Sequence, residues 1–324
     1  LAALARGYLA LPLPDDAELR GYGSVPRFTD EPRPGVSVVV PFLGDVEEQR
    51  ATRGWMRRLR LGPGDEAILV DNGRAAAASG GGGGESDPGP DTAVTTIRAT
   101  GERSSYHARN VGARRAQGEW LLFLDADTRP PPSLLDDYFR EPVDQRCGAV
   151  AGGVVAARDQ RALVACYAAS RRYLSQAAHF RDAHRPYGIT ANLLVRRAAW
   201  EGVGGFVEGI RSGGDADFCW RIQDAGWTLA YREPAAVEHR HRERLMPQLR
   251  QMARYSAAIA WMDRRLPGSS PRPPVLRRLG RAAGGTGVWL AAGRPRRSLF
   301  SAIDGLVVIA EGVGWLMSND APSD

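Results

Sequence analysis

The chain has 324 residues, of which 43% are hydrophobic and 25% charged, an ordinary composition for a globular protein. Its formal net charge is +6, but every basic residue is arginine, and so complete a preference indicates a GC-rich gene as readily as a function. The positive charge is therefore poor evidence for a nucleic-acid partner, and we expect none. The length suits one large α/β domain or one domain with an appendage.

Cysteine usage and hydropathy indicate the compartment. Cys147, Cys166 and Cys219 are odd in number and far apart, without the spacing of a metal site or a disulfide framework. A reducing compartment is the default for such a chain. The sequence has no run of about 18 uncharged apolar residues, so we expect no membrane span. These features together predict a cytoplasmic protein.

The first half of the chain alternates strands with helices. Short β-branched and aliphatic runs predict strands at 36–40, 66–70, 92–98 and 120–124, with helices at 46–61 and 105–116. This alternation implies a parallel, doubly wound sheet. In such sheets, ligands bind at the carboxyl ends of the strands. Pro41, Asp71 and Asp125 each follow a strand, so we expect these three positions to converge on one crevice.

The second half is less regular. We expect a strand at 148–155, helices at 163–178, 215–226 and 245–265, a polar turn and strand over 187–197, and a tight turn over 200–206. Residues 75–91 include five consecutive glycines and predict a disordered surface loop. The domain division that follows is a lead-in over 1–35, the main α/β domain over 36–265 and a C-terminal helical segment over 266–324.

Two carboxylates, one residue apart, follow the most apolar predicted strand. Asp125 and Asp127 come directly after residues 120–124, and charge at the end of a buried strand is costly unless it is neutralised. A divalent cation would neutralise it. Hard oxygen ligands suit Mg²⁺ or Mn²⁺, ions that also bind substrate diphosphates. The alternative is that one of these aspartates only caps the turn before Pro130.

Six segments, in order, resemble the inverting family-2 glycosyltransferases of the GT-A fold. The matching segments are VSVVVP at 36–41, LVDNG at 69–73, ARNVG at 108–112, DAD at 125–127, ANLLVRR at 191–197 with GGF at 204–206, and GDADFCWRI at 214–222. The resemblance extends from about residue 36 to about residue 265. The series is far more specific than any single motif in it.

The resemblance implies an α/β fold of GT-A type: a Rossmann-like, mostly parallel sheet flanked by helices, here with a C-terminal helical appendage. It implies a metal-dependent enzyme that transfers a sugar from a nucleotide-diphosphate sugar to an acceptor hydroxyl with inversion. By resemblance, Asp125 and Asp127 hold the metal and Asp215 is the general base. The nucleotide-sugar-binding residues that it implies are Pro41, Phe42, Asp71, Arg98, Arg109, Asn110, Asp125, Ala126 and Asn192.

His239 and His241 lie in a short basic stretch, and a strand there would place both side chains on one face. A histidine at this position completes the metal site or contacts the diphosphate in relatives, so the resemblance implies that His239 is a metal ligand. The alternative is a solvated basic turn. Asp217 and Arg221, four residues apart on a predicted helix, are expected to form a structural ion pair.

The sequence also departs from the family pattern. Gly214 stands where the family usually has glutamate before the base, which leaves open a catalytically inactive sugar-nucleotide-binding or scaffold protein of the same fold. A nucleotidyltransferase is disfavoured because residues 41–45 are not a glycine-rich basic loop. A dehydrogenase is disfavoured because no G-x-G-x-x-G follows the first strand.

The C-terminal segment is both basic and apolar. Residues 264–297 contain nine arginines and no acidic residue, and apolar residues dominate 305–317. This composition suits contact with an anionic membrane surface, which would put the protein at the inner face of the cell membrane. The alternative is a helical pair that closes over the main domain. We expect a UDP-sugar donor and a sugar, lipid-linked or small-molecule acceptor, as in the synthesis of a cell-envelope polysaccharide.

Overall fold

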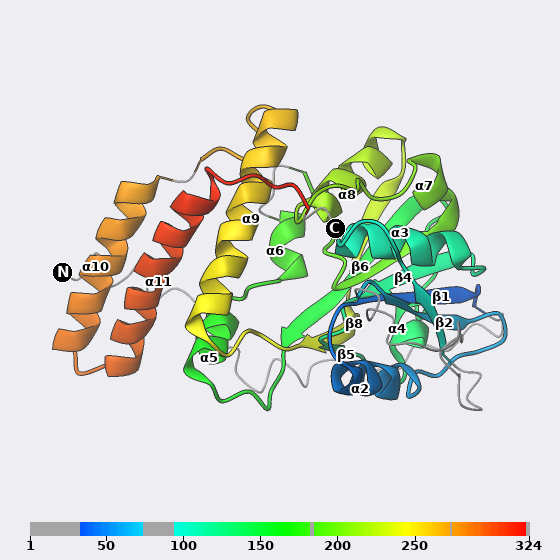
Figure 1. The fold of residues 1–324 in the computed structure, drawn as a ribbon, viewed down its shortest axis with the longest axis horizontal. Helices are drawn as coiled ribbons and strands as arrows, with labels where there is room; N and C mark the ends of the chain where they lie inside the picture. Colours follow the sequence, from blue (N-terminus) through cyan, green and yellow to red (C-terminus); the bar gives the residue numbers. More distant parts are fainter. Residues whose placement is uncertain (1–32, 74–93, 182–184, 273, 322–324) are drawn as a thin grey trace, which may run out of the picture. The chain divides into compact units, whose positions relative to one another are not determined.

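An eight-stranded mixed sheet forms the centre of the fold, with its strands in the order β3-β2-β1-β4-β7-β6-β8-β5 (Figure 1). The computed structural model describes residues 33–73, 94–181, 185–272 and 274–321. Most of the predicted lead-in and the whole glycine-rich loop lie outside the described residues. The fold is the predicted one: a Rossmann-like sheet with flanking helices and a helical C-terminal segment.

The first four strands of the sheet are parallel. They are β1 (Val36–Phe42), β2 (Glu66–Asp71), β3 (Thr95–Arg98) and β4 (Trp120–Leu124). All five residues of β4 are buried, as expected for a parallel strand that is covered on both faces. Strand β1 extends one residue past Pro41, but its pairing with β4 stops at Val39, so the proline lies beyond that ladder.

The other half of the sheet is mixed. Strand β7 (Asn192–Arg196) is antiparallel to both β4 and β6 (Cys147–Ala156), whereas β8 (Thr228–His239) is parallel to β6. The short strand β5 (Thr128–Arg129) pairs antiparallel with the end of β8, with Thr128 opposite His239. This last pairing brings the end of β8 to the segment that follows β4.

The described part of the chain forms ten helices: α2 (Val46–Met56), α3 (Ser105–Arg115), α4 (Leu134–Tyr138), α5 (Leu163–Ser170), α6 (Gln176–Arg181), α7 (Arg197–Gly202), α8 (Gly214–Asp224), α9 (Leu245–Arg265), α10 (Val275–Ala291) and α11 (Pro295–Gly314). Alternate residues of β1 serve two cores: Val38 and Val40 pack with Trp55 of α2, and Val39 packs with Ala108 of α3. Each of these two helices has a side-chain N-cap, Asp45 for α2 and Ser104 for α3.

Three local predictions differ from the structure. The single helix expected at 163–178 is two helices, α5 and α6, because Arg172 and Leu174 adopt positive φ angles of 52° and 69° between them. The tight turn expected from residue 200 begins later, since α7 continues to Gly202. Strand β8 ends at His239, so His241 does not share a strand face with it.

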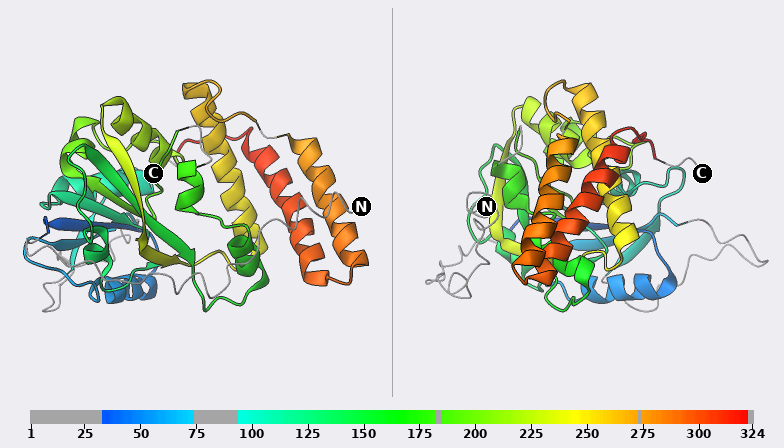
Figure 2. Two further views of the ribbon diagram at one scale, coloured as in Figure 1. Left: turned by 180° about the vertical axis from the view of Figure 1, so that it is seen from behind. Right: turned by 90° about the vertical axis from the view of Figure 1, so that its left-hand side faces the viewer.

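The C-terminal segment forms a helical hairpin. Helix α10 packs against α11, which in turn packs against α9, so that α11 lies between the other two in both views of Figure 2. Beyond α11, the chain returns to the main domain, where Asp320 pairs with Ile210. The compact unit that contains the sheet runs from Arg33 to the C-terminus. Within the described residues, none of the helices combines the length and apolarity that crossing a membrane demands.

Candidate active site

A single cleft of about 1240 Å³ lies at the carboxyl ends of β1 and β4. Pro41 and Phe42 at the end of β1 line it, together with Asp125, Ala126 and Asp127 after β4. Its other walls come from the N-terminal half of α3, the start of α8, the end of β8 and one face of α9. Of the three strand tips predicted to converge, those after β1 and β4 meet in this crevice, whereas Asp71 at the end of β2 does not line it.

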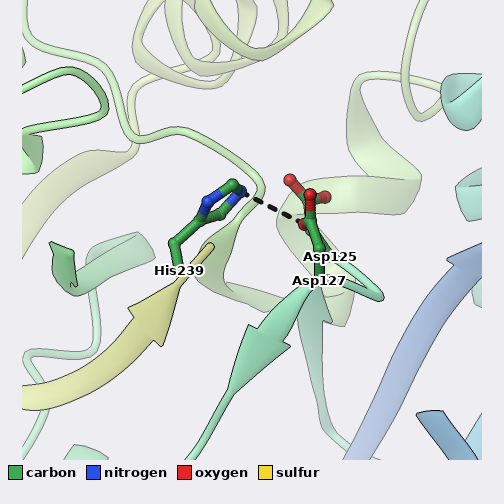
Figure 3. Close-up of side chains that lie close together, drawn as sticks. All are labelled: Asp125, Asp127 and His239. Carbon is green, nitrogen blue, oxygen red and sulfur yellow. Dashed lines mark ion pairs between the residues drawn. The ribbon is translucent and has the colours of Figure 1, made fainter. Parts of the chain in front are cut away.

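Asp125, Asp127 and His239 form a cluster in this cleft, and each offers a ligand atom within 4.8 Å of the others. Figure 3 shows the imidazole of His239 pointing from the end of β8 toward the two carboxylates. His239 Nε2 lies 3.2 Å from Asp127 Oδ1. The pairing of β5 with β8 explains this proximity, because Thr128, next to Asp127, stands opposite His239.

Arg109 holds one carboxylate of the cluster. Its guanidinium, only 5% exposed, donates to Asp125 Oδ1 at 2.5 Å. Burial raises the pKa of Asp125 above its usual value; Arg109 opposes this shift, and the negative charge of Asp127 adds to it. The carboxylate is therefore short of positive charge even with Arg109 beside it. A cation bound between the two aspartates would relieve that deficit.

The second carboxylate is paired with the histidine. Burial by itself would raise the pKa of Asp127, but the hydrogen bond from His239 and the charges of His239 and Arg242 outweigh it and lower that pKa. Burial lowers the pKa of His239, but the hydrogen bond to Asp127 and the charge of Asp127 together raise that pKa by more, so the net shift is upward. Without a cation, this geometry favours an imidazolium–carboxylate pair.

The far side of the His239 ring faces a small cavity of about 10 Å³. His239 Nδ1 and Gln248 Nε2, from α9, are buried without a hydrogen-bond partner among the described residues, and both residues line this cavity. His241 lines it too, and burial and the neighbouring His239 charge lower the pKa of His241 to about 4. The pKa of His239 is therefore raised and the pKa of His241 is lowered. Of the two, His239 is the one paired with a carboxylate of the cluster.

The donor set fits a divalent cation that prefers oxygen. Two carboxylates and one imidazole, gathered at a strand edge inside an open cleft, match the mixed oxygen and nitrogen ligands that Mn²⁺ accepts and that Mg²⁺ tolerates. Oδ2 of Asp127 lies 4.0 Å from Nη2 of Arg242. At that distance the oxygen remains accessible to a cation.

Asp215 lies on another wall of the same cleft, in the first turn of α8. Its two carboxylate oxygens accept hydrogen bonds from the backbone N–H and the hydroxyl of Thr190, each at 3.2 Å. The helix begins after Gly213, whose φ of 83° a residue with a side chain would adopt only with strain. The helix dipole favours the ionised carboxylate at this position.

Packing against Tyr106 explains why glycine occupies position 214, where the family usually has glutamate. A Cβ built on Gly214 would lie 2.8 Å from atoms of the Tyr106 ring, so a side chain could not enter without displacing that ring. The Tyr106 hydroxyl accepts the Gly214 N–H at 3.0 Å. Burial, and secondarily the charge of Asp215, raise the pKa of Tyr106 well above its usual value, so it stays a neutral phenol.

Two asparagines predicted to bind the nucleotide sugar do not line the cleft. Asn110 donates to the backbone of Phe206 and to Glu208, and accepts the Phe206 N–H, so it fastens the loop after α7. Asn192 is fully buried and bonded to Tyr138 and to the backbone of Gly153 and Ala235. The structure therefore does not bring these two predicted residues to the cleft, because their amides are occupied by internal partners.

Asp71 and Arg98 are also absent from the cleft lining. Asp71 Oδ1 accepts the Gly73 N–H at 2.8 Å, and Arg98 donates to the Gly73 carbonyl, so both shape the turn after β2. Asn72, the residue after Asp71, does line the cleft, but its amide donates to the carbonyls of Ala99 and Glu102. The turn after β2 therefore reaches the cleft through Asn72 rather than through the predicted aspartate.

The wall formed by α9 was not among the predicted parts of the site. Gln251, Arg254 and Tyr255 all line the cleft, and their spacing places them on one helical face. A polar face on a helix correctly predicted at 245–265 was the available signal. Arg211 and Ser212, just before α8, line the cleft as well. The expected ion pair of Asp217 with Arg221 is confirmed at 2.8 Å.

The parallel half-sheet, the acidic strand tip and the second, mixed half-sheet together make up a fold of GT-A type. The model of "Glycosyl transferase family group 2" matches residues 120–308, which is more than half of the chain. The chain belongs to this family.

Two curated relatives are similar over most of the chain. A pre-mycofactocin glycosyltransferase of Mycobacterium tuberculosis is 29% identical over 231 residues, covering 69% of this chain and 47% of the relative. Glycosyltransferase AglE of Haloferax volcanii is 27% identical over 202 residues, covering 61% of this chain and 64% of the relative. The chain thus spans about half the length of the first relative and less than two thirds of the second.

A solved structure shares the fold. The mannosyltransferase PcManGT of Pyrobaculum calidifontis, in complex with GDP-Man and Mn²⁺, is similar with a TM-score of 0.57 at 21% sequence identity. The similarity covers 87% of this chain and 86% of that one. At this identity, the likeness establishes the common fold.

Proposed function

We propose that the chain is a metal-dependent glycosyltransferase that transfers a sugar from a nucleotide-diphosphate sugar to an acceptor hydroxyl with inversion at the sugar carbon. One observation carries the proposal: a single cleft holds both the Asp125, Asp127 and His239 cluster and a separate carboxylate, Asp215. The first fits a cation for the leaving diphosphate, and the second fits a base for the incoming hydroxyl.

On the donor side, Asp125, Asp127 and His239 would hold Mg²⁺ or Mn²⁺. A bound cation supplies positive charge where the diphosphate becomes more negative as it leaves. Arg109 fixes Asp125 in place, and Arg242 adds positive charge beside Asp127. Pro41, Phe42 and Ala126 line the cleft next to the cluster and form the surface on which the nucleotide would lie.

On the acceptor side, Asp215 would take the proton of the attacking hydroxyl. Inversion in one displacement requires a base on the side of the sugar away from the leaving diphosphate. The two hydrogen bonds from Thr190 fix the orientation of the Asp215 carboxylate while leaving each oxygen with further accepting capacity. Arg211, Ser212, Arg254 and Tyr255 line the same cleft and are the residues proposed to contact the acceptor.

The substrates follow less directly from the residues. We propose a UDP-sugar donor, and GDP-mannose, the ligand of the solved neighbour, is the alternative to compare with it. The acceptor is proposed to be a sugar, a lipid-linked sugar or a small molecule in the synthesis of a cell-envelope polysaccharide. The domain that performs this reaction is proposed to span residues 36–265.

The first prediction concerns the metal. We expect UDP or GDP to bind the parent protein more tightly with Mn²⁺ than without it, and Asp127→Asn to weaken the Mn²⁺-dependent binding by about ten-fold or more. Calorimetric titration of each nucleotide, with and without Mn²⁺, measures this. Asp144→Asn is the matched control, because it makes the same change at an exposed position outside the cleft. Equal affinities in the parent and in Asp127→Asn would remove the metal site from the proposal.

A further inference from the structure

The two ring nitrogens of His239 have different surroundings. Nε2 lies 3.2 Å from Asp127 Oδ1 and faces the carboxylate cluster (Figure 3). Nδ1, on the other side of the ring, has no hydrogen-bond partner in the described part of the chain, although His239 is only 6% exposed. Leaving a buried polar atom without a partner is costly, so this nitrogen indicates a partner that the protein side chains around it do not supply.

A second polar atom without a partner belongs to the same cavity. Gln248, near the start of α9, is 1% exposed, and its Nε2 likewise finds no hydrogen-bond partner within the described residues. Gln248 and His239 both line the cavity of about 10 Å³. Because neither atom has a partner, the two side chains are not bonded to each other directly, and whatever satisfies one of them can satisfy the other.

Both atoms are hydrogen-bond donors when a metal is bound at His239 Nε2. A metal on Nε2 leaves the ring proton on Nδ1, and the amide nitrogen of Gln248 carries two protons. Two donors cannot bond to each other, and together they make the cavity unfavourable for a cation. The oxygen of one water molecule can accept both hydrogen bonds, and a cavity of about 10 Å³ is of the size that holds one water.

The surroundings of the cavity suit a water molecule. Leu174, Arg240 and Arg242 line both the cavity and the cleft, so the cavity adjoins the cleft and solvent can enter from it. Tyr173 and Tyr255 also line the cavity. Their hydroxyl oxygens are acceptors of the kind that the two hydrogen atoms of a water require.

Packing holds Gln248 at this position. Met252, one turn further along α9, is buried and lines the cavity too. It packs with Phe300 and Ile303 of α11 in one apolar cluster. Helix α9 is thus fixed on the side of the C-terminal hairpin, and a packed helix rather than a loop presents Gln248 to His239.

We propose that one buried water molecule joins His239 Nδ1 to Gln248 Nε2, and that Gln248 is the positioning residue that keeps His239 Nε2 turned toward the metal. A hydrogen bond on the outer nitrogen of a metal-binding histidine fixes the orientation of the ring and the nitrogen that carries the proton. Gln248 does not touch the metal; it acts through the water and His239. The inference rests on the metal site of the proposed function and adds a residue from α9 to it.

The test measures Mn²⁺ binding by the full chain without any acceptor, so that it does not depend on turnover. Mn²⁺ is titrated in the presence of UDP or GDP, whichever the parent binds, and free Mn²⁺ is followed by electron paramagnetic resonance. Gln248→Leu removes the polar partner of the water, and we expect Mn²⁺ to bind about ten- to a hundred-fold more weakly. Gln248→Glu keeps a group that can bond to the water, and should bind Mn²⁺ nearly as the parent does.

Pulsed paramagnetic resonance of the bound Mn²⁺ adds a readout that a general loosening of the fold would not change. Coupling to the imidazole nitrogen of His239 should appear in the parent and in Gln248→Glu. It should be reduced or lost in Gln248→Leu, because the ring is no longer held in place. His239→Gln gives the reference spectrum without this nitrogen.

The matched control is Gln176→Leu, the same change at a glutamine that is also 1% exposed but lines neither the cleft nor the cavity. Gln176 donates to the carbonyls of Ile189 and Asn192, so its loss should lower stability and leave Mn²⁺ affinity at the parental value. Circular dichroism of every variant checks that it is folded.

Parental Mn²⁺ affinity and parental nitrogen coupling in Gln248→Leu would overturn the inference and leave the metal site in place. A loss of affinity in Gln176→Leu as great as in Gln248→Leu would overturn it as well. A parent that binds no Mn²⁺ would instead remove the metal site from the proposed function, and this inference with it.

Discussion

Asn192 lies at the start of β7, and each of its side-chain polar atoms has a hydrogen-bond partner inside the protein. Its carbonyl accepts from the Tyr138 hydroxyl at 2.8 Å, and its amide donates to the backbone of Gly153 and Ala235. The two backbone partners belong to β6 and β8. The Asn192 side chain thereby links β7 to β6 and to β8. Strand β8 ends at His239, and β7 pairs with β4, the strand that Asp125 follows.

The second prediction is that Asn192→Ala acts on stability. It leaves three buried polar groups without partners, each worth about 1–3 kcal/mol, so we expect the free energy of unfolding to fall by about 3 kcal/mol or more. Urea denaturation measures this. Gln145→Ala, at an exposed position, is the control and should change stability by less than about 0.5 kcal/mol. A stable Asn192→Ala variant with weakened nucleotide binding would restore the original assignment.

The same residue shows what sequence reasoning can and cannot reach. Asp125, Asp127, His239 and Asp215 were all predicted as site residues, and the structure puts all four in one cleft. Charge after a buried strand marks Asp125 and Asp127 in the sequence, whereas the family resemblance implied His239 and Asp215. Asn192 was predicted as a ligand contact from the family resemblance. Its internal partners, 39 and 43 residues away, become neighbours only when β6 pairs with β7 and β8 pairs with β6.

At the scale of elements, the segment after α11 braces the loop that precedes the proposed base. Arg211 donates its backbone N–H to the Asn319 carbonyl at 2.8 Å, and the Asn319 amide donates to the Ser212 carbonyl at 2.9 Å. Asn319 is only 2% exposed. Gly213 then packs on Ala258 of α9, and α8 begins. The loop is thus held from two sides just before Asp215.

The third prediction tests this brace. Asn319→Ala removes the hydrogen bond to the Ser212 carbonyl, so we expect amide hydrogen exchange over residues 209–214 to accelerate by about ten-fold, the equivalent of one buried hydrogen bond. Acceptor KM should rise, while nucleotide affinity stays at the parental value. The neighbouring Asp320→Asn is the control, because Asp320 pairs with the loop through its backbone. Unchanged exchange in Asn319→Ala would show that the loop does not depend on this contact.

Element boundaries were predictable where a single local cause sets them. The helix at 245–265 begins and ends where its polar and apolar spacing predicted, and the strand at 120–124 is marked by five buried residues. The break between α5 and α6 was not predictable, since Arg172 and Leu174 carry no glycine-like signal for a positive φ. His241 was misplaced because β8 stops at the residue that pairs with Thr128.

At the scale of the whole molecule, the order of apolar strands and helices was enough to predict the fold class, because buried parallel strands are continuous apolar runs. The antiparallel insertion of β7 and the pairing of β5 with β8 depend on contacts between distant segments. So does the packing of the C-terminal hairpin on α9, and so do the hydrogen bonds by which Asp304 of α11 joins Tyr167 and Arg171 at α5. The hairpin packs on the main domain, while Leu306, Ile309 and Val313 of α11 stay exposed.

The central claim is that the cleft works as two halves: a donor half built on β4 and β8, and an acceptor half built on α8. Substitutions in the two halves should then have separable effects. Loss of a metal ligand should weaken donor binding. Loss of the base should leave donor binding intact and slow the chemical step.

The measurement that tests this most directly compares the transfer rate and the donor affinity of the parent, Asp215→Asn and Asp217→Asn. We expect Asp215→Asn to lower kcat by about a hundred- to ten-thousand-fold, the usual contribution of a general base, with donor affinity nearly unchanged. Asp217→Asn is the control: Asp217 pairs with Arg221 and Arg265, so its loss should lower stability and leave the chemistry in place. A parent that binds sugar nucleotide but transfers to no acceptor, or an Asp215→Asn variant with parental kcat, would contradict the account.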